Sequence, residues 1–348
     1  MKREYGIDLF RVLAALIVFM FHGKLRGMHN YGIFNNFISM GAMFMTAFFM
    51  LSAFSLYYIY SKTDFSLKGQ IKKFYIKRAV SIYPIYWIWM LWVIITYKDS
   101  IVNKIVTFPI NMLGLQSLWH KLYFRDEGGV WFVSCILFCY ILFPFLCIVL
   151  KQLSVKGKLA LLVFFYIMSF YTQVFTKLTG WEGFCSNYAD CIFRYFEFCV
   201  GGIWASILID HKVINAKWLK NWWVFIIEGL TLILLVSLGI SLEIGVGDYM
   251  LYNIISIPIY CLMFYTLLGI KVSAGCAKTI GYFSNISYAF YVMQTFAWTA
   301  MEFIVTKLGW KCNIAIIICS ILVNVVIASF VTYGIHKPVT NWCRKRLV

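Results

Sequence analysis

Charged residues are scarce in this sequence. Asp, Glu, Lys and Arg make up 13% of its 348 residues, whereas a soluble domain has about 25%. Long apolar runs recur from one end of the chain to the other, and a helix needs about 20 mostly apolar residues to cross a bilayer. The composition therefore excludes a soluble protein. It predicts an all-α, polytopic membrane protein in which residues 1–348 form one domain.

The sequence also lacks the short alternating segments, about ten residues each, that a transmembrane β-barrel requires. Its runs, such as WVFIIEGLTLILLVSLGI, are almost continuously apolar. Acidic residues are scarcer than basic ones, 14 against 31, which gives a net charge of +17. The basic residues fall in short segments between the apolar runs, where they set the orientation in the membrane. We therefore expect a lipid bilayer, and no nucleic acid, as a partner.

A cluster of metal ligands is missing as well. The eleven cysteines are scattered, and Cys135 and Cys139 share a helix face without a His or carboxylate cluster beside them. Such cysteines are typical of small apolar core residues. No metal and no permanently bound cofactor is expected.

The apolar runs predict ten spans, which lie at residues 8–26, 36–60, 79–97, 130–150, 158–176, 190–210, 222–242, 249–270, 281–305 and 313–335. With a cytoplasmic N-terminus, 20 of the 31 Lys and Arg residues fall in inside segments and 9 in outside loops. Because positive charge gathers on the cytoplasmic side, both termini are expected there. Residues 101–118 are apolar too, but Pro109 and Asn111 interrupt them, and we interpret them as a re-entrant or interfacial element.

A few ionisable residues nevertheless lie inside the predicted spans: Asp8, Arg11, His22, Arg194, Glu197, Glu228 and Glu302. A central charge costs at least about 2.5–3.5 kcal/mol on insertion, so such residues usually face a protein interior or a water-filled cavity. Asp8 with Arg11, and Arg194 with Glu197, are three residues apart and share a helix face. Each pair is either a structural ion pair or part of a site.

Arg11 and His22 have a further relation. Eleven residues turn a helix by about three full turns and 20°, so the two side chains lie on nearly the same face, about 16 Å apart along the axis. A guanidinium is a forked, permanently charged ligand for phosphate, and a neutral imidazole accepts a proton from a hydroxyl. One helix face thus offers an anion anchor and a base, with a gap that suits an acyl-pantetheine arm.

Several motifs occur in the order of a known family. They are Asp8-x-x-Arg11 followed by His22, FFMLSAFSL at 48–56, FYIKRAVSIYPIYW at 74–87, GGVWFVSCILFCYILFP at 128–144, FRYFEFCVGG at 193–202, ISYAFYVMQ at 286–294 and YGIHKPVTNWCRKR at 333–346. Together they resemble the integral-membrane acyltransferases of bacterial surface polysaccharides, acyltransferase family three. The likeness covers nearly the whole chain.

The resemblance implies about ten spans in the bacterial cytoplasmic membrane and an O-acyltransferase. The donor is expected to be cytoplasmic acyl-CoA, acetyl-CoA above all. The acceptor is expected to be a hydroxyl of an envelope glycan or lipid-linked sugar, in company with polysaccharide biosynthesis proteins. It places Arg11 on the CoA side and His22, as the base, on the acceptor side, with Asp8, Arg194 and Glu197 in support.

Further candidates come from the basic loop and the aromatic residues. Lys72, Lys73, Lys77 and Arg78 lie in a segment expected to be a cytoplasmic loop, where they either hold CoA phosphates or only set the orientation. Trp131, together with Trp119, is a candidate for stacking on a sugar ring at the outer mouth.

Four positions depart from the family pattern. Ile136 stands in place of a common Glu, Gln294 of a common His, His336 of a common Glu, and Ser81 of a common Arg. These departures argue against a second acid or base in the fourth or ninth span.

Two other functions remain alternatives. A transporter or flippase of a lipid-linked sugar also needs intramembrane charges, although the inverted repeats that would favour it are not evident. An acyl carrier would instead hand the acyl group to a separate transferase.

Overall fold

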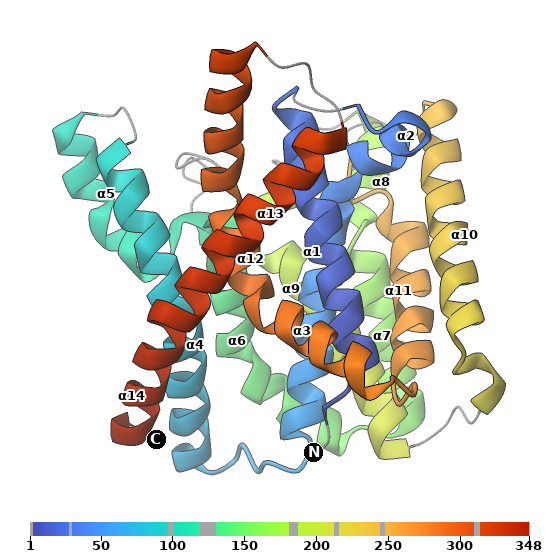
Figure 1. Ribbon diagram of the computed structural model, residues 1–348. Helices are drawn as coiled ribbons and strands as arrows, with labels where there is room; N and C mark the ends of the chain where they lie inside the picture. Colours follow the sequence, from blue (N-terminus) through green and yellow to red (C-terminus); the bar gives the residue numbers. More distant parts are fainter. Residues whose placement is uncertain are drawn as a thin grey trace.

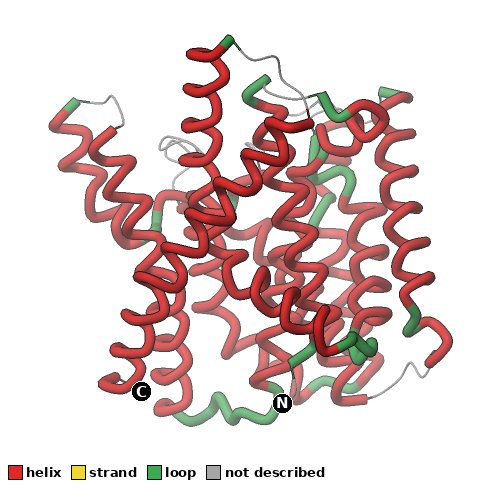
Figure 2. Tube along the Cα trace, in the orientation of Figure 1, coloured by secondary structure: helices red, strands yellow, loops and turns green. Residues whose placement is uncertain are grey.

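The structure of the protein, a computed structural model, describes residues 3–27, 30–96, 100–118, 130–180, 187–211, 216–243, 248–309 and 314–347. All regular secondary structure in this part of the chain is helical (Figure 2), which confirms the predicted class. The α-helices are α1 (Tyr5–Leu25), α2 (Asn35–Ser39), α3 (Phe44–Tyr60), α4 (Lys68–Thr96), α5 (Ile101–Leu113), α6 (Val130–Gln152), α7 (Val155–Met168), α8 (Tyr171–Thr179), α9 (Cys191–Ser206), α10 (Trp222–Ser241), α11 (Asn253–Leu267), α12 (Ala274–Leu308), α13 (Ile314–Phe330) and α14 (Lys337–Leu347). Short 3-10 turns are η1 (Gly32–Phe34), η2 (Gly41–Met43), η3 (Gln116–Leu118), η5 (Asn187–Ala189) and η7 (Lys217–Leu219), and π-helical turns are η6 (Ile207–His211) and η8 (Val331–His336).

The chain is a polytopic membrane protein. Within the described residues, 7 helices are long and apolar enough to cross a membrane, or 8 if α7 and α8, which meet at a bend of 44°, form one span. The last three expected spans correspond to α11, with only 15 residues, to α12, with 35, and to α13 continued by η8 and α14. The count of ten stays a prediction.

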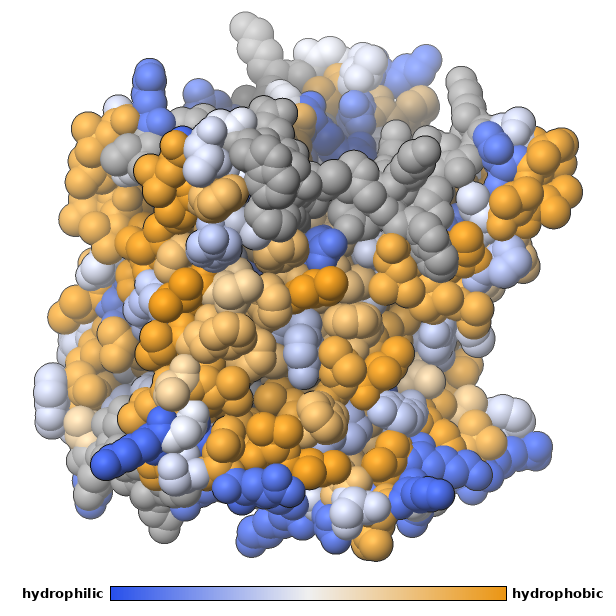
Figure 3. Space-filling model, turned by 180° about the vertical axis from the view of Figure 1, so that it is seen from behind, coloured by the Kyte–Doolittle hydropathy of each residue, from blue (hydrophilic) through white to orange (hydrophobic). Residues whose placement is uncertain are grey.

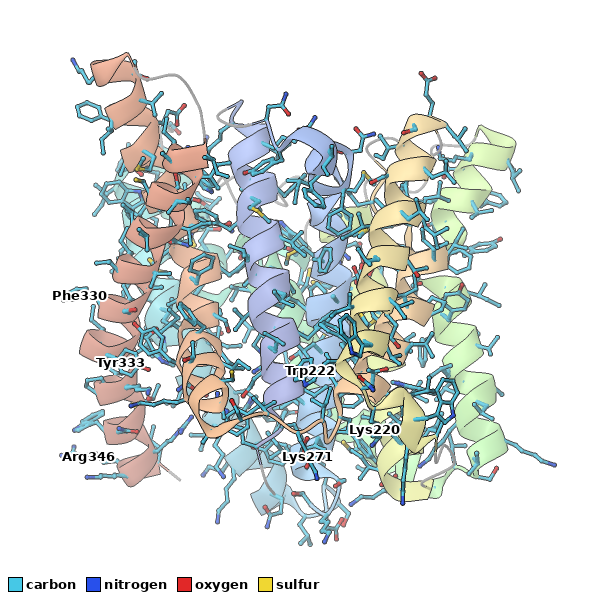
Figure 4. The ribbon with its side chains drawn as sticks, turned by 45° about the vertical axis from the view of Figure 1, so that its right-hand side comes forward. Lys220, Trp222, Lys271, Phe330, Tyr333 and Arg346 are labelled. Carbon is cyan, nitrogen blue, oxygen red and sulfur yellow. The ribbon has the colours of Figure 1, made fainter. Side chains whose placement is uncertain are left out.

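The surface is divided as a bilayer requires. Seen from behind, apolar residues form a broad belt around the middle, and hydrophilic residues gather along the lower edge (Figure 3). Lys220, Lys271 and Arg346 lie toward that lower end, and Trp222 and Tyr333 lie just above them (Figure 4). Aromatic residues above cations are typical of a membrane interface, and cations mark its cytoplasmic side.

Both ends of the described chain also lie at this lower end (Figure 1). Chain ends on one side require an even number of crossings, which is compatible with eight or ten spans. That the lower end faces the cytoplasm stays a prediction.

Helix α1 rises through the middle of the bundle (Figure 1), and its contacts with α3 and α12 show in which direction these two helices run. The Tyr58 hydroxyl of α3 donates to Glu4 at the start of α1, at 2.9 Å, whereas α2, which precedes α3 in the chain, lies at the upper end (Figure 1). Helix α3 is therefore antiparallel to α1. Arg11, lower on α1, contacts Ser284 of α12 at 3.1 Å, and Arg26, at the upper end of α1, pairs with Glu302 at 3.0 Å, so α12 runs parallel to α1.

Helices α3 and α9 approach each other closely because α9 carries glycine at the contact. A Cβ added to Gly201 would lie 2.0 Å from the carbonyl oxygen of Met50 on α3. Small residues allow such backbone contact between membrane helices. The contact fixes α9, and with it Arg194 and Glu197, against α3.

The basic segment expected as a loop is in fact helical. Helix α4 begins at Lys68, eleven residues before the predicted span. Its first turns have one side that packs on the core, where Phe74 is buried, and this packing extends the helix below the apolar run. Residues 101–118 form α5 and η3. Helix α5 packs back along the upper part of α4, where Trp87 Nε1 donates to the Met112 carbonyl at 2.9 Å.

Candidate active site

Two adjoining cavities lie in the lower half of the bundle. The larger has a volume of about 680 Å³ and is lined by the start of α1 and by α3, α4 and α12. The smaller, about 340 Å³, adds α6 and η8 to its walls. The two share six lining residues, which are Arg11, Ser55, Ile59, Arg78, Ser81 and Ser284. They therefore form one path that leads from the lower end of α1 into the middle of the bundle.

Arg11 stands where the two cavities meet. Its Nη1 donates to Asp8 Oδ1 at 2.8 Å and to the Ser284 hydroxyl at 3.1 Å, and its Nη2 donates to the Ser55 hydroxyl at 3.2 Å. The other oxygen of Asp8 accepts from Arg3 Nε. The Arg11 side chain stays 28% exposed. The fork of the guanidinium is thus oriented by three helices while one face remains on the cavity.

The ionised side chains of the larger cavity leave it positive. Three arginines, Arg3, Arg11 and Arg78, line it against two carboxylates, Glu4 and Asp8. Asp8 serves two of these arginines at once, and Glu4 accepts from uncharged donors, the Tyr58 hydroxyl and the Gly269 N–H. An anionic ligand would compensate this excess charge.

Of the four basic candidates in the expected loop, the structure brings only Arg78 to the cavities. It lines both of them, and its guanidinium lies 5.9 Å from the ring centres of Phe74 and Tyr140. Its buried Nε has no hydrogen-bond partner among the described residues. Lys72 and Lys73 are exposed on the outer face of α4, and Lys77 is half-buried without lining either cavity.

Two departures from the family pattern meet at the edge of the smaller cavity. Nε2 of His336, on η8, lies 2.9 Å from the carbonyl oxygen of Ser81 on α4, and therefore donates to it. The Ser81 hydroxyl accepts from Arg344 of α14 at 3.3 Å. Both Ser81 and His336 line the cavity. Ser81 and His336 are thus neighbours in space, and their hydrogen bonds join α4 to η8 and α14.

The smaller cavity ends at three aromatic rings. Phe48 of α3, Phe132 of α6 and Tyr291 of α12 all line it and contact one another, with ring centres 5.2–6.3 Å apart. Ile136, which replaces the common Glu, lines the same part. This end of the cavity is therefore apolar.

His22 lies near the upper end of α1, outside the lining of both cavities. Its Nδ1 is 2.8 Å from the carbonyl oxygen of Val18. Because a carbonyl oxygen only accepts, Nδ1 carries the hydrogen, and in the neutral ring Nε2 is left as the proton acceptor. The backbone thus holds the imidazole in the tautomer that a base requires.

Arg194 and Glu197 form a closed cluster in the upper half of the bundle. Their side chains are 1% and 0% exposed, and Arg194 Nη1 donates to both oxygens of Glu197 at 2.8 Å. Thr46 and Asn253 also donate to Glu197, at 2.9 Å each. The Arg194 guanidinium lies over the rings of Phe49, Trp131 and Tyr188.

This cluster corrects the interpretation of Trp131. The side chain is 5% exposed, because Arg194 covers one part of the ring and Tyr188 lies 4.8 Å away. In this structure it has no open face for a sugar. Trp119 lies outside the described residues.

Sequence reasoning missed several cavity residues. Arg3, Ser55, Ser284 and Tyr140 come from four segments that are far apart in the chain. Ser55 falls within the motif FFMLSAFSL, which resembles a family motif. Its hydroxyl in an otherwise apolar span is the feature of the sequence that could have marked it as a cavity residue. Within the described residues, no group of three side chains that could hold a metal converges.

The comparison with protein families agrees with this arrangement. The family model of the acyltransferase domain, that of acyltransferase family 3, matches residues 4–346. No curated protein and no solved structure matches the chain. Because the match covers nearly the whole sequence, this chain belongs to acyltransferase family 3 and is a membrane acyltransferase.

Proposed function

We propose that the protein transfers an acyl group, most simply acetyl, from cytoplasmic acyl-CoA to a hydroxyl of a cell-envelope glycan or glycolipid. The observation that carries this proposal is the cavity around Arg11, which is positive where it begins at the lower end and apolar where it ends. An acyl-CoA likewise has an anionic end and an apolar end. Its phosphates are anionic, and its acyl end is apolar.

The donor would lie along the path of the two cavities. Arg3, Arg11 and Arg78 line the cavity and face the donor's anionic and polar groups. From Glu4 to Arg11, α1 rises by about 10 Å, and a similar distance separates Arg11 from the three rings. An extended pantetheine arm has this order of length.

The chemistry of the transfer assigns one step to His22. The hydroxyl oxygen of the acceptor attacks the thioester carbonyl, the new C–O bond forms and the C–S bond breaks. The hydroxyl proton passes to Nε2 of His22 and then to the departing thiolate of CoA. The main task of the protein is to hold the two substrates in line.

The two substrates approach from opposite ends of α1. The rings of Phe48, Phe132 and Tyr291 close the donor cavity below the level of His22, since α1 places His22 about 16 Å above Arg11. Transfer therefore requires these rings to move aside after the donor has been loaded.

Replacement of His22 by Gln tests the proposal. The variant keeps a polar side chain but removes the proton acceptor, so transfer of acetyl to a glycan by purified protein in liposomes should fall by roughly 10²–10⁴-fold. Binding of acetyl-CoA should persist, because the cavities do not include His22. Arg26→Lys is the matched control, since Arg26 is one turn away and pairs with the surface residue Glu302, and lysine keeps the positive charge that acts on the His22 ring.

Two results would contradict the proposal. Transfer at the wild-type rate by a folded His22→Gln protein would remove His22 as the base. Release of CoA without any acylated glycan, in wild type and variant alike, would point to an acyl carrier instead.

A further inference from the structure

We infer that Phe48, Phe132 and Tyr291 select the donor by the length of its acyl group. The inference rests on the proposed function and names what the upper end of the donor cavity does. These three residues come from α3, α6 and α12, and each lines the smaller cavity.

The register of the helices places all three rings at one level above Arg11. Phe48 precedes Ser55 on the descending helix α3, and Tyr291 follows Ser284 on the rising helix α12, by seven residues in each case. Ser55 and Ser284 both contact Arg11. Seven residues correspond to about 10 Å of helix, so Phe48 and Tyr291 lie about 10 Å above the guanidinium.

The third ring reaches the same level from α6. Tyr140 of α6 is hydrogen-bonded to Ser52 of α3 at 2.9 Å, and Phe132 contacts Phe49 of α3 with ring centres 5.0 Å apart. The two helices therefore run in the same direction. Phe132 is thus displaced from Tyr140 toward the upper end and joins Phe48.

The rings form a continuous plug because each touches the other two. The ring centres are 6.3 Å apart for Phe48 and Phe132, 6.2 Å for Phe48 and Tyr291, and 5.2 Å for Phe132 and Tyr291. Behind this plug lie Phe49 and Trp131 of the closed Arg194 cluster.

Leu51 and Ile136 line the space next to the rings, and hydroxyl-bearing residues, among them Ser52 and Ser287, follow below them. The cationic residues Arg11 and Arg78 stand about two helical turns below the rings. A short, uncharged acyl group fits next to the rings. Each further methylene would have to displace a ring, and a terminal carboxylate beside the rings would lose water without a cation to compensate its charge.

The test compares donors of different length in one preparation. Purified Phe132→Ala and wild-type protein in liposomes receive acetyl-CoA or butyryl-CoA with an acceptor glycan, and the release of CoA is followed. Removal of the ring should raise the ratio of kcat/KM for butyryl-CoA to that for acetyl-CoA by roughly tenfold, because two added methylene groups then become buried. The change should appear in KM, since selection takes place on loading.

Two variants guard against trivial effects. Phe138→Ala is the matched control, because this ring lies on the same helix, contacts Tyr195 and lines neither cavity; its donor ratio should equal that of wild type. Phe48→Leu trims the same plug with a smaller loss of volume, and should shift the ratio in the same direction but less. It replaces Phe132→Ala if that variant does not fold.

The possible outcomes distinguish a failure of the role of the rings from a failure of the proposed function. Use of acetyl-CoA by wild type, with an unchanged donor ratio in Phe132→Ala or Phe48→Leu, would overturn the role of the rings alone. An equal shift in Phe138→Ala would also overturn it. Absence of CoA release from every donor by wild type would contradict the proposed function itself, and the inference with it.

Discussion

Asp8 with Arg11 in α1, and Arg194 with Glu197 in α9, are two arginine–carboxylate pairs with the same three-residue spacing and the same closest distance, 2.8 Å. Their surroundings differ. Arg11 is 28% exposed and faces a cavity, and its carboxylate is shared with Arg3. Arg194 is 1% exposed, is the only cation paired with Glu197 among the described residues and is enclosed by aromatic rings.

The difference teaches how a membrane protein uses the same pair for two purposes. A pair whose charges cancel and whose side chains are enclosed, as those of Arg194 and Glu197 are, presents no accessible charge to a ligand, although Arg194 Nη2 has no hydrogen-bond partner among the described residues. A pair that shares its carboxylate leaves positive charge on an accessible surface. We therefore expect substitutions at Arg194 or Glu197 to act on stability and substitutions at Arg11 to act on the donor.

The largest effect is expected from Glu197→Gln. The change leaves Arg194 buried without a counter-charge, and removal of one partner from a buried pair destabilises a protein by about 3–5 kcal/mol. Denaturant unfolding in detergent would measure the loss. Glu302→Gln is the control, because its pair with Arg26 is on the surface and is worth about 1 kcal/mol or less. An equal, small loss in both variants would mean that the Arg194 cluster does not hold the fold.

A smaller and different effect is expected from Arg11→Lys. Lysine keeps the charge but cannot place donors on Asp8, Ser284 and Ser55 together, as the two terminal nitrogens of Arg11 do. The KM for acetyl-CoA should rise roughly tenfold, the order of one lost charge-assisted hydrogen bond. The free energy of unfolding should change by less than about 1 kcal/mol. If Arg11→Lys unfolds as readily as Glu197→Gln, the distinction between the two pairs is wrong.

Sequence reasoning predicted the helical class and the shared face of Arg11 and His22, because both follow from local patterns. Hydropathy marks apolar runs, and a regular helix fixes the angle between two of its residues. The same reasoning could not separate the two arginine pairs. What separates them is contact with residues such as Ser284, 273 positions from Arg11, and no pattern along one helix contains that information.

The beginning of α4 shows a second limit of sequence reasoning. Basic residues between two apolar runs predict a loop, and Lys72, Lys73 and Arg78 looked equivalent as phosphate ligands. In the structure they share a helix whose opposite sides face water and the cavity. Their difference arises from the way α4 packs against α6 and η8.

The smallest effect is therefore expected from the exposed lysines. A double variant, Lys72→Gln with Lys73→Gln, removes two charges outside the cavity, so it should raise the KM for acetyl-CoA only about two- to threefold at low salt. The rise should vanish at about 0.5 M salt, where charges in water are screened over a few ångströms. Arg78→Gln is the comparison, and its rise of roughly tenfold should persist in salt because the guanidinium lines the cavity beside the rings of Phe74 and Tyr140. If the double variant matches Arg78→Gln at every salt concentration, the exposed side of α4 binds the donor directly, and the phosphates lie outside the cavity that Arg11 lines.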